Sequence, residues 1–191
     1  MTDGAQAAKG AAAQIFREVE ILMGLVIKPE EKRWLEKPVQ RPQPTATLLY
    51  LGCNVLRTPH MAQTVTGIFQ RLGEDFVALG GPAFCCGLPF EYAGASEEAR
   101  GWGERLASQF SRFQPREVVM WCPGCFHFYR NALGLSGPFR LSHVSEFLAE
   151  RRNTLPFAPQ RSTKVALHYH SDSPDAEGQA AAARALLEAA P

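Results

Sequence analysis

Short apolar runs that alternate with helix-like stretches are the feature of this sequence that most restricts its fold. The runs at 47–51, 76–79 and 118–121 have the length of strands, and each is followed at once by glycine or cysteine. Helix-like patterns separate them, from Pro59 to Leu72 and from Ser96 to about Phe113. Strands that alternate with helices indicate βαβ units. We therefore expect an α/β fold in which a short, mostly parallel sheet with flanking helices is built from Rossmann-like βαβ modules.

The chain divides into three expected parts, namely 1–44, 45–160 and 161–191. The first part is predicted to be an amphipathic helix that ends near Gly24, followed by a proline-rich connector. The apolar residues of this N-terminal helical extension are Ile15, Val19, Leu22 and Met23, with Phe16 beside them. Such a face packs either on its own domain or on a partner subunit, and the first is the more common arrangement.

Further elements are expected after the third apolar run. They are a helix over 123–133, a brief strand at 139–141, a helix through Val144 to Leu148, a strand over 164–169 and a helix over 176–190.

Five cysteines in 191 residues are the chemically informative count. They are Cys53, Cys85, Cys86, Cys122 and Cys125. The N-terminus has no basic segment leading into an apolar core, so we expect no secretory signal and a cytoplasmic location. In a reducing compartment, clustered thiols indicate metal or redox chemistry more often than disulfides.

The cysteines follow the predicted strands, and this placement predicts where they meet. Cys53 and Cys122 come directly after two strands, and the Cys85-Cys86 pair lies in the loop after the remaining one. The carboxyl ends of parallel strands lie along the same edge of a sheet, where ligands of open α/β folds bind. We therefore expect all the thiols to converge at this edge.

The spacing resembles that of a known family. There are 31 residues between Cys53 and Cys85, 35 between Cys86 and Cys122, and 2 between Cys122 and Cys125. Together with Leu51-Gly52-Cys53, the loop Gly80-Gly81-Pro82-Ala83-Phe84-Cys85-Cys86-Gly87 and Cys122-Pro123-Gly124-Cys125, this pattern is similar to the cysteine-rich CCG module of heterodisulfide reductases. The same module occurs in the iron–sulfur subunits of lactate and glycolate oxidation systems. The resemblance covers Leu49 to about Leu133.

The resemblance implies an iron–sulfur centre. In heterodisulfide reductase the module holds a non-cubane [4Fe-4S] cluster with all five thiolates, which here would be Cys53, Cys85, Cys86, Cys122 and Cys125. Soft thiolate ligands suit such a cluster. The family implies electron transfer with a flavoprotein or ferredoxin-type partner subunit.

The resemblance is incomplete beyond residue 160. Lys164 to His170 resembles the strand that opens a second module, but Ser171, Asp172 and Ser173 follow where many relatives place a cysteine. No second Cys-Cys pair is present. We therefore expect a component of an oxidoreductase, as a subunit or fragment, rather than a complete enzyme.

Two other interpretations of the same cysteines stay open. Zinc in a structural, interaction-mediating domain would use four thiolates and leave one idle. A dithiol oxidoreductase would use Cys122-Pro123-Gly124-Cys125 at a strand-to-helix junction and leave three thiols without a role. His60, His127, His168 and His170 are interpreted as ordinary polar residues, although any of them lies where a cluster sulfur or a metal could be reached.

The charge balance argues against several classes of partner. Lys and Arg number 20 and Asp and Glu 19, which leaves a net charge of +1. Such a balance gives no electrostatic reason to expect nucleic acid as a partner. No run of about 20 apolar residues is present, so we do not expect a transmembrane protein.

Overall fold

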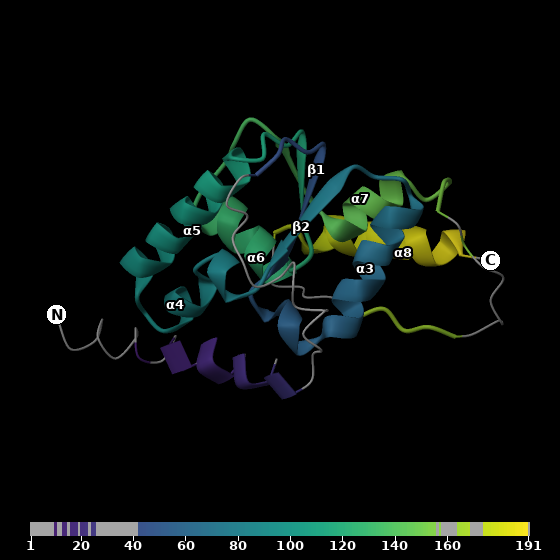
Figure 1. Ribbon diagram of the computed structural model, residues 1–191. Coiled ribbons are helices and arrows are strands. Elements are labelled where there is room, and N and C mark those ends of the chain that lie inside the picture. The colour runs from purple at the N-terminus through teal and green to yellow at the C-terminus, as the bar shows by residue number, and fades with distance from the viewer. Residues whose placement is uncertain are drawn as a thin grey trace.

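The computed structural model describes residues 10, 13–14, 16–18, 20–22, 24–25, 42–155, 157, 164–168 and 174–190, with only the backbone of Asn54 and Leu56. Figure 1 shows the sheet in the middle of the molecule with helices on both of its sides. The strands are β1 (Thr47–Gly52), β2 (Phe76–Gly80), β3 (Glu117–Met120) and β4 (Arg140–His143). The α-helices are α3 (Pro59–Arg71), α4 (Leu88–Tyr92), α5 (Ser96–Ser111), α6 (Pro123–His127), α7 (Val144–Glu150) and α8 (Ala176–Ala189).

The four strands form one sheet in the order β2-β1-β3-β4, and every neighbouring pair is parallel. From β1 the chain moves to β2 on one side, and it then crosses back to β3 on the other side. This reversal puts a topological switch point between β1 and β3, which is where open α/β sheets bind their ligands. The prediction of an α/β fold with a short, mostly parallel sheet is confirmed.

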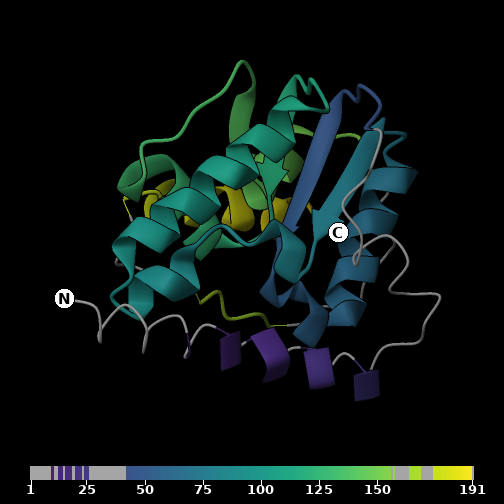
Figure 2. The same ribbon diagram turned by 60° about the vertical axis from the view of Figure 1, so that its left-hand side comes forward.

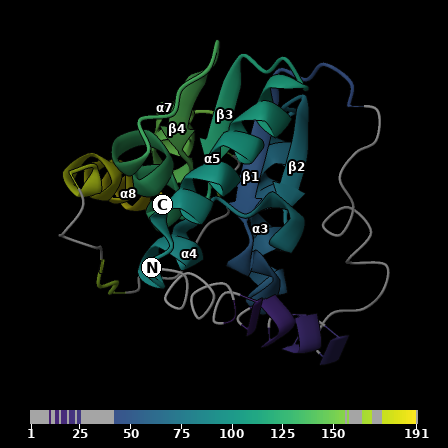
Figure 3. The same ribbon diagram turned by 90° about the vertical axis from the view of Figure 1, so that its left-hand side faces the viewer.

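Alternation along β1 explains why both faces of the sheet are covered. Leu48 and Tyr50 belong to one core cluster, whereas Leu49 and Leu51 belong to the other, and each is at most 1% exposed. Successive side chains of a strand point to opposite faces, so a strand buried on both faces is apolar throughout. Residues of α4, α5 and α6 complete the first core, and residues of α3 and α7 complete the second. In Figure 3, α5 lies in front of the sheet.

Most of the predicted elements are present, with two differences. Helix α4, which follows the Cys85-Cys86 loop, has no counterpart in the prediction. The strand predicted over 164–169 is wrong for 164–168, which have no regular secondary structure and are exposed, since none of the described strands pairs with them. Residues 169 and 170 lie outside the described part of the chain.

The described residues between 10 and 25 are helical, as predicted. In Figures 1 and 2 they run along the end of the molecule toward which β1 and β2 point. Phe16 packs on the domain, with its ring centroid 6.0 Å from that of Phe90 and 6.2 Å from that of Trp102. Phe16 therefore supports packing against the same domain. Ile15, Val19 and Met23 lie outside the described residues.

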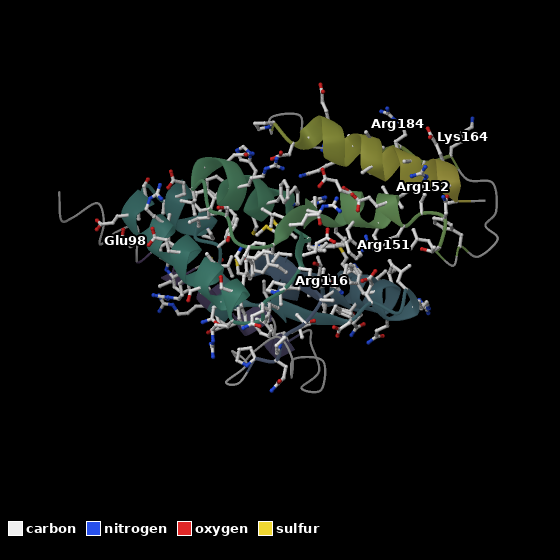
Figure 4. All side chains as sticks on the ribbon, turned by 90° about the horizontal axis from the view of Figure 1, so that it is seen from above. Glu98, Arg116, Arg151, Arg152, Lys164 and Arg184 are labelled. Atoms are coloured by element: carbon white, nitrogen blue, oxygen red, sulfur yellow. The ribbon has the colours of Figure 1, made fainter. Side chains whose placement is uncertain are left out.

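Charged side chains tie α7 to the sheet. Arg151 forms an ion pair of 2.7 Å with Glu74 and lies over the ring of Phe147, 3.5 Å from its centroid. Figure 4 shows Arg151, Arg152 and Arg184 on the side of α7 and α8, whereas Glu98 lies at the far end of α5. Within the described ranges, no helix has both the length and the apolar character needed to cross a bilayer.

Candidate metal centre

The structure brings together all five cysteines that the sequence singles out. Cys53 follows β1, Cys85 and Cys86 follow the 3-10 turn after β2, and Cys122 and Cys125 lie at the start of α6 after β3. These are the carboxyl ends of three adjacent strands, on both sides of the switch point. The expected convergence of the thiols is therefore found.

The sulfur atoms form a row. The Sγ atoms of Cys86 and Cys125 are 3.2 Å apart. Cys53 and Cys86 both act on the pKa of Cys85, and Cys122 and Cys86 act on that of Cys125, so each of these thiols lies beside the ones that affect it. The order along the row is thus Cys53, Cys85, Cys86, Cys125 and Cys122, which we call the thiol row. Among the described residues, no group of three or more His, Cys, Asp or Glu side chains is arranged around a single metal position.

Burial differs along the thiol row. Cys85 and Cys86 are each 1% exposed and Cys125 is 5% exposed, whereas Cys53 and Cys122 at the two ends are half-buried. The middle of the row is therefore shielded from water, and both ends approach the surface. Burial and hydrogen bonding around sulfur ligands are the means by which a protein sets a metal centre's reduction potential.

The thiols share protons unevenly. Hydrogen bonding with Cys125 and Cys85 lowers the pKa of Cys86 to about 4, and hydrogen bonding with Cys125 lowers the pKa of Cys122 to about 7. The pKa of Cys85 is raised by its hydrogen bonds to Cys53 and Cys86, and that of Cys125 by its bonds to Cys122 and Cys86. Raised and lowered pKa values thus alternate along Cys85, Cys86, Cys125 and Cys122. Full ionisation of adjacent sulfurs needs a cation, because like charges so close repel one another.

Backbone groups also contact the sulfurs. The Gly87 N–H donates to Cys85 Sγ over 3.4 Å, and the Cys125 N–H donates to Cys122 Sγ over 3.5 Å. Gly87 has a φ of +98°, and a Cβ there would overlap the carbonyl group of Ala99 on α5. The glycine after the vicinal pair is therefore required by both its backbone angle and the close approach of α5.

Two residues near the thiol row were not identified from the sequence. Tyr50 is fully buried on β1, and its hydroxyl donates to the Phe84 carbonyl over 2.7 Å. His143, at the end of β4, lies 3.2 Å from the Trp121 carbonyl through Nε2. Tyr50 has the pattern of a core strand residue, and His143 lies outside the cysteine motifs, so no local signal separates either from ordinary packing.

The structure describes His60, His127 and His168 in less detail than His143. His60 is exposed on α3. His127 is joined to Asn131 by a hydrogen bond of 3.0 Å and lies 3.9 Å from Asp175. His168 is exposed, and His170 lies outside the described residues. The interpretation of His60, His127 and His168 as ordinary polar residues stays a prediction.

His143 is held in its neutral form. Its Nδ1 accepts hydrogen bonds from the Ser145 N–H and hydroxyl, while its Nε2–H donates to the Trp121 carbonyl. This network fixes the proton on Nε2 and ties the start of α7 to the residue before Cys122. Burial lowers the pKa of His143 from 6.5 to about 4.

We expect the protein to lose stability as the pH falls from about 6.5 to about 4. In this window the unfolded chain binds a proton at His143 and the folded chain does not, so acid favours unfolding. The expected loss from this group is roughly 3 kcal/mol, at 1.36 kcal/mol per pKa unit. Urea denaturation at several pH values measures it. The His143→Gln variant should show a shallower pH dependence; equal slopes in His143→Gln and the unmodified protein would contradict the assignment.

Comparisons with known proteins identify the type of domain in which the thiol row lies. Residues 47–129 match the family model CCG, described as a cysteine-rich domain, so the resemblance seen in the sequence is confirmed. A curated relative is one of the subunits of the dihydromethanophenazine:CoB--CoM heterodisulfide reductase of Methanosarcina barkeri (strain Fusaro / DSM 804). The two are 23% identical over 125 residues, which cover 61% of this chain and 31% of the relative. The chain thus corresponds to about a third of the relative's length. No solved structure matches.

Proposed function

Since residues 47–129 form a cysteine-rich domain of the CCG type, we propose that the thiol row binds an iron–sulfur cluster and that the chain is an electron-transfer component of a heterodisulfide reductase-like oxidoreductase. The single observation that carries this proposal is the row itself. Five thiols from the ends of three strands are joined side by side at the switch point of the sheet. A structural zinc site uses four ligands and would leave one of the five thiols without a role.

The donor set fits an iron–sulfur cluster. Every side chain of the row is a soft sulfur ligand, and the adjacent thiolates need positive charge before they all ionise. A bound cluster supplies one-electron redox chemistry that cysteine side chains do not provide alone. Cys53, Cys85, Cys86, Cys122 and Cys125 are the proposed ligands, and a non-cubane [4Fe-4S] cluster is the proposed type, since the row extends over five sulfurs.

The protein's own groups have three tasks in this proposal. Cys85, Cys86 and Cys125 hold metal in a place that water does not reach, because each is buried. The Gly87 and Cys125 N–H groups donate to sulfur and stabilise its negative charge. The half-buried Cys53 and Cys122 bring the ends of the row close to the surface, where a flavoprotein or ferredoxin-type partner subunit exchanges electrons.

Metal analysis of anaerobically purified protein tests the proposal. We expect iron and acid-labile sulfide together, a broad visible absorption band, and an electron paramagnetic resonance (EPR) signal in one oxidation state. Colourless protein with one zinc per chain would contradict it in favour of a structural zinc site. Metal-free protein that reduces insulin disulfides would contradict it in favour of dithiol chemistry.

A further inference from the structure

Tyr50 places a hydroxyl on β1 among Leu48, Leu49 and Leu51. It lies on β1 beside the switch point and is 0% exposed. Its hydroxyl donates to the carbonyl of Phe84, 34 residues further along the chain, over 2.7 Å. A buried hydroxyl is costly unless it is hydrogen-bonded, and phenylalanine would fill the same space without this requirement. The bond to Phe84 offsets this cost and joins β1 to the turn that precedes the vicinal cysteines.

The Phe84 carbonyl belongs to the peptide group that leads into the vicinal pair. The N–H of the same peptide group, on Cys85, donates to the Pro82 carbonyl over 3.2 Å. Tyr50 thus holds one side of this peptide plane and Pro82 holds the other. With both sides bound, rotation of the plane is restricted, and so is the direction in which the backbone enters Cys85-Cys86.

This direction decides where the two adjacent sulfurs point. Cys85 has φ −66° and ψ 140°, which is extended backbone. These angles lie close to polyproline II, in which successive side chains are turned by roughly 120° from one another and so point in different directions. Accordingly Cys85 reaches Cys53 and Cys86 reaches Cys125. The thiol row is continuous because the pair diverges in this way.

We infer that Tyr50 is a positioning residue of the thiol row: its hydroxyl fixes the Phe84–Cys85 peptide group so that Cys85 is directed toward Cys53 and Cys86 toward Cys125, the arrangement in which both would ligate a bound cluster. The inference rests on the proposed function. Burial and the charges of Cys125, Cys86, Cys53 and Cys85 raise the pKa of Tyr50 well above its usual value, so the hydroxyl stays a donor.

A second tyrosine in the same core provides a matched control. Tyr129 is also 0% exposed and packs on Phe110, as Tyr50 does. Its hydroxyl has no hydrogen-bond partner among the described residues. Tyr50→Phe and Tyr129→Phe therefore remove the same atom from the same core, and Tyr50→Phe alone frees a carbonyl group next to the thiol row.

The experiment compares the unmodified protein, Tyr50→Phe and Tyr129→Phe after anaerobic reconstitution with iron and sulfide. We expect Tyr50→Phe to show altered EPR g-values and an altered visible circular dichroism spectrum. We also expect it to lose iron to a chelator about tenfold faster than the unmodified protein, since a buried acceptor has lost its donor. Tyr129→Phe should match the unmodified protein in all three measurements.

Far-ultraviolet circular dichroism of the metal-free proteins checks folding. If Tyr50→Phe does not fold, replacing Tyr50 with 3-fluorotyrosine keeps the ring and the hydroxyl and changes the donor strength, and the same spectra are compared with 3-fluorotyrosine at position 129. Spectra unaltered by the change at position 50 overturn the inference and leave the proposed function standing. Unmodified protein that takes up no iron overturns the proposed function, and the inference with it.

Discussion

The Cys85→Ser variant is expected to lose nearly all of its iron and its EPR signal while keeping its fold. Cys85 joins Cys53 to Cys86, so its replacement interrupts the thiol row between one end and the centre. A serine hydroxyl is a hard, weakly acidic ligand and does not replace a thiolate on iron. Iron and sulfide content after anaerobic reconstitution, together with EPR, measures the loss.

The fold of the metal-free variant should survive because serine replaces sulfur's local contact. Cys85 Sγ accepts a hydrogen bond from the Gly87 N–H, and a serine oxygen can accept the same bond. We expect its free energy of unfolding to change by about 1 kcal/mol or less, as for the exchange of one modest hydrogen bond. Ala83→Ser, on the exposed side of the same turn, is the matched control and should keep its iron.

The outcome also separates electron transfer from a structural metal. If metal serves only to hold the fold, the unmodified protein should show no redox signal. Cys85→Ser should then only lower the stability of the reconstituted protein. Cys85→Ser with full iron content and an unchanged EPR signal would contradict the assignment of Cys85 as a ligand.

The sequence predicts the sheet and the meeting of the thiols because both depend on local signals. Strands β1 and β3 are apolar runs with Cys53 and Cys122 just beyond them. Parallel connection then places these positions on one edge, whatever the details of packing. Cys85 and Cys86 lie in the loop after β2, which starts at the same edge of the sheet, so they meet Cys53 and Cys122 there.

The supporting contacts are not predictable in this way, because they join distant positions. The partner of the Tyr50 hydroxyl is the Phe84 carbonyl, which carries no side-chain signal. His143 reaches the Trp121 carbonyl across 22 residues. Residues 164–168 alternate like a strand, with Val165 and Leu167 apolar, yet they are exposed and unpaired among the described strands, since alternation does not supply a partner strand.

The Gly87→Ala variant is expected to be the most destabilised of the substitutions considered, by about 3 kcal/mol or more, and to fail in iron uptake. Gly87 is the N-cap residue just before α4 and has a φ of +98°, where an L residue is strained. Its added Cβ would also overlap the backbone carbonyl of Ala99, which is fully buried on α5 and has no room to move. Backbone strain and overpacking both lower the free energy of unfolding here, so the total loss exceeds the loss from either effect alone.

Gly94→Ala isolates the contribution of the backbone angle. Gly94 follows α4 with a φ of +78°, but a Cβ there meets nothing within 4 Å. We expect it to lose about 1 kcal/mol, the cost of left-handed backbone alone, and to keep its iron. Urea denaturation of the metal-free proteins gives both values. Equal losses in Gly87→Ala and Gly94→Ala would show that the close approach of α5 is not what demands glycine after the vicinal cysteines, and that the α4–α5 contact leaves room for a side chain beside the thiol row.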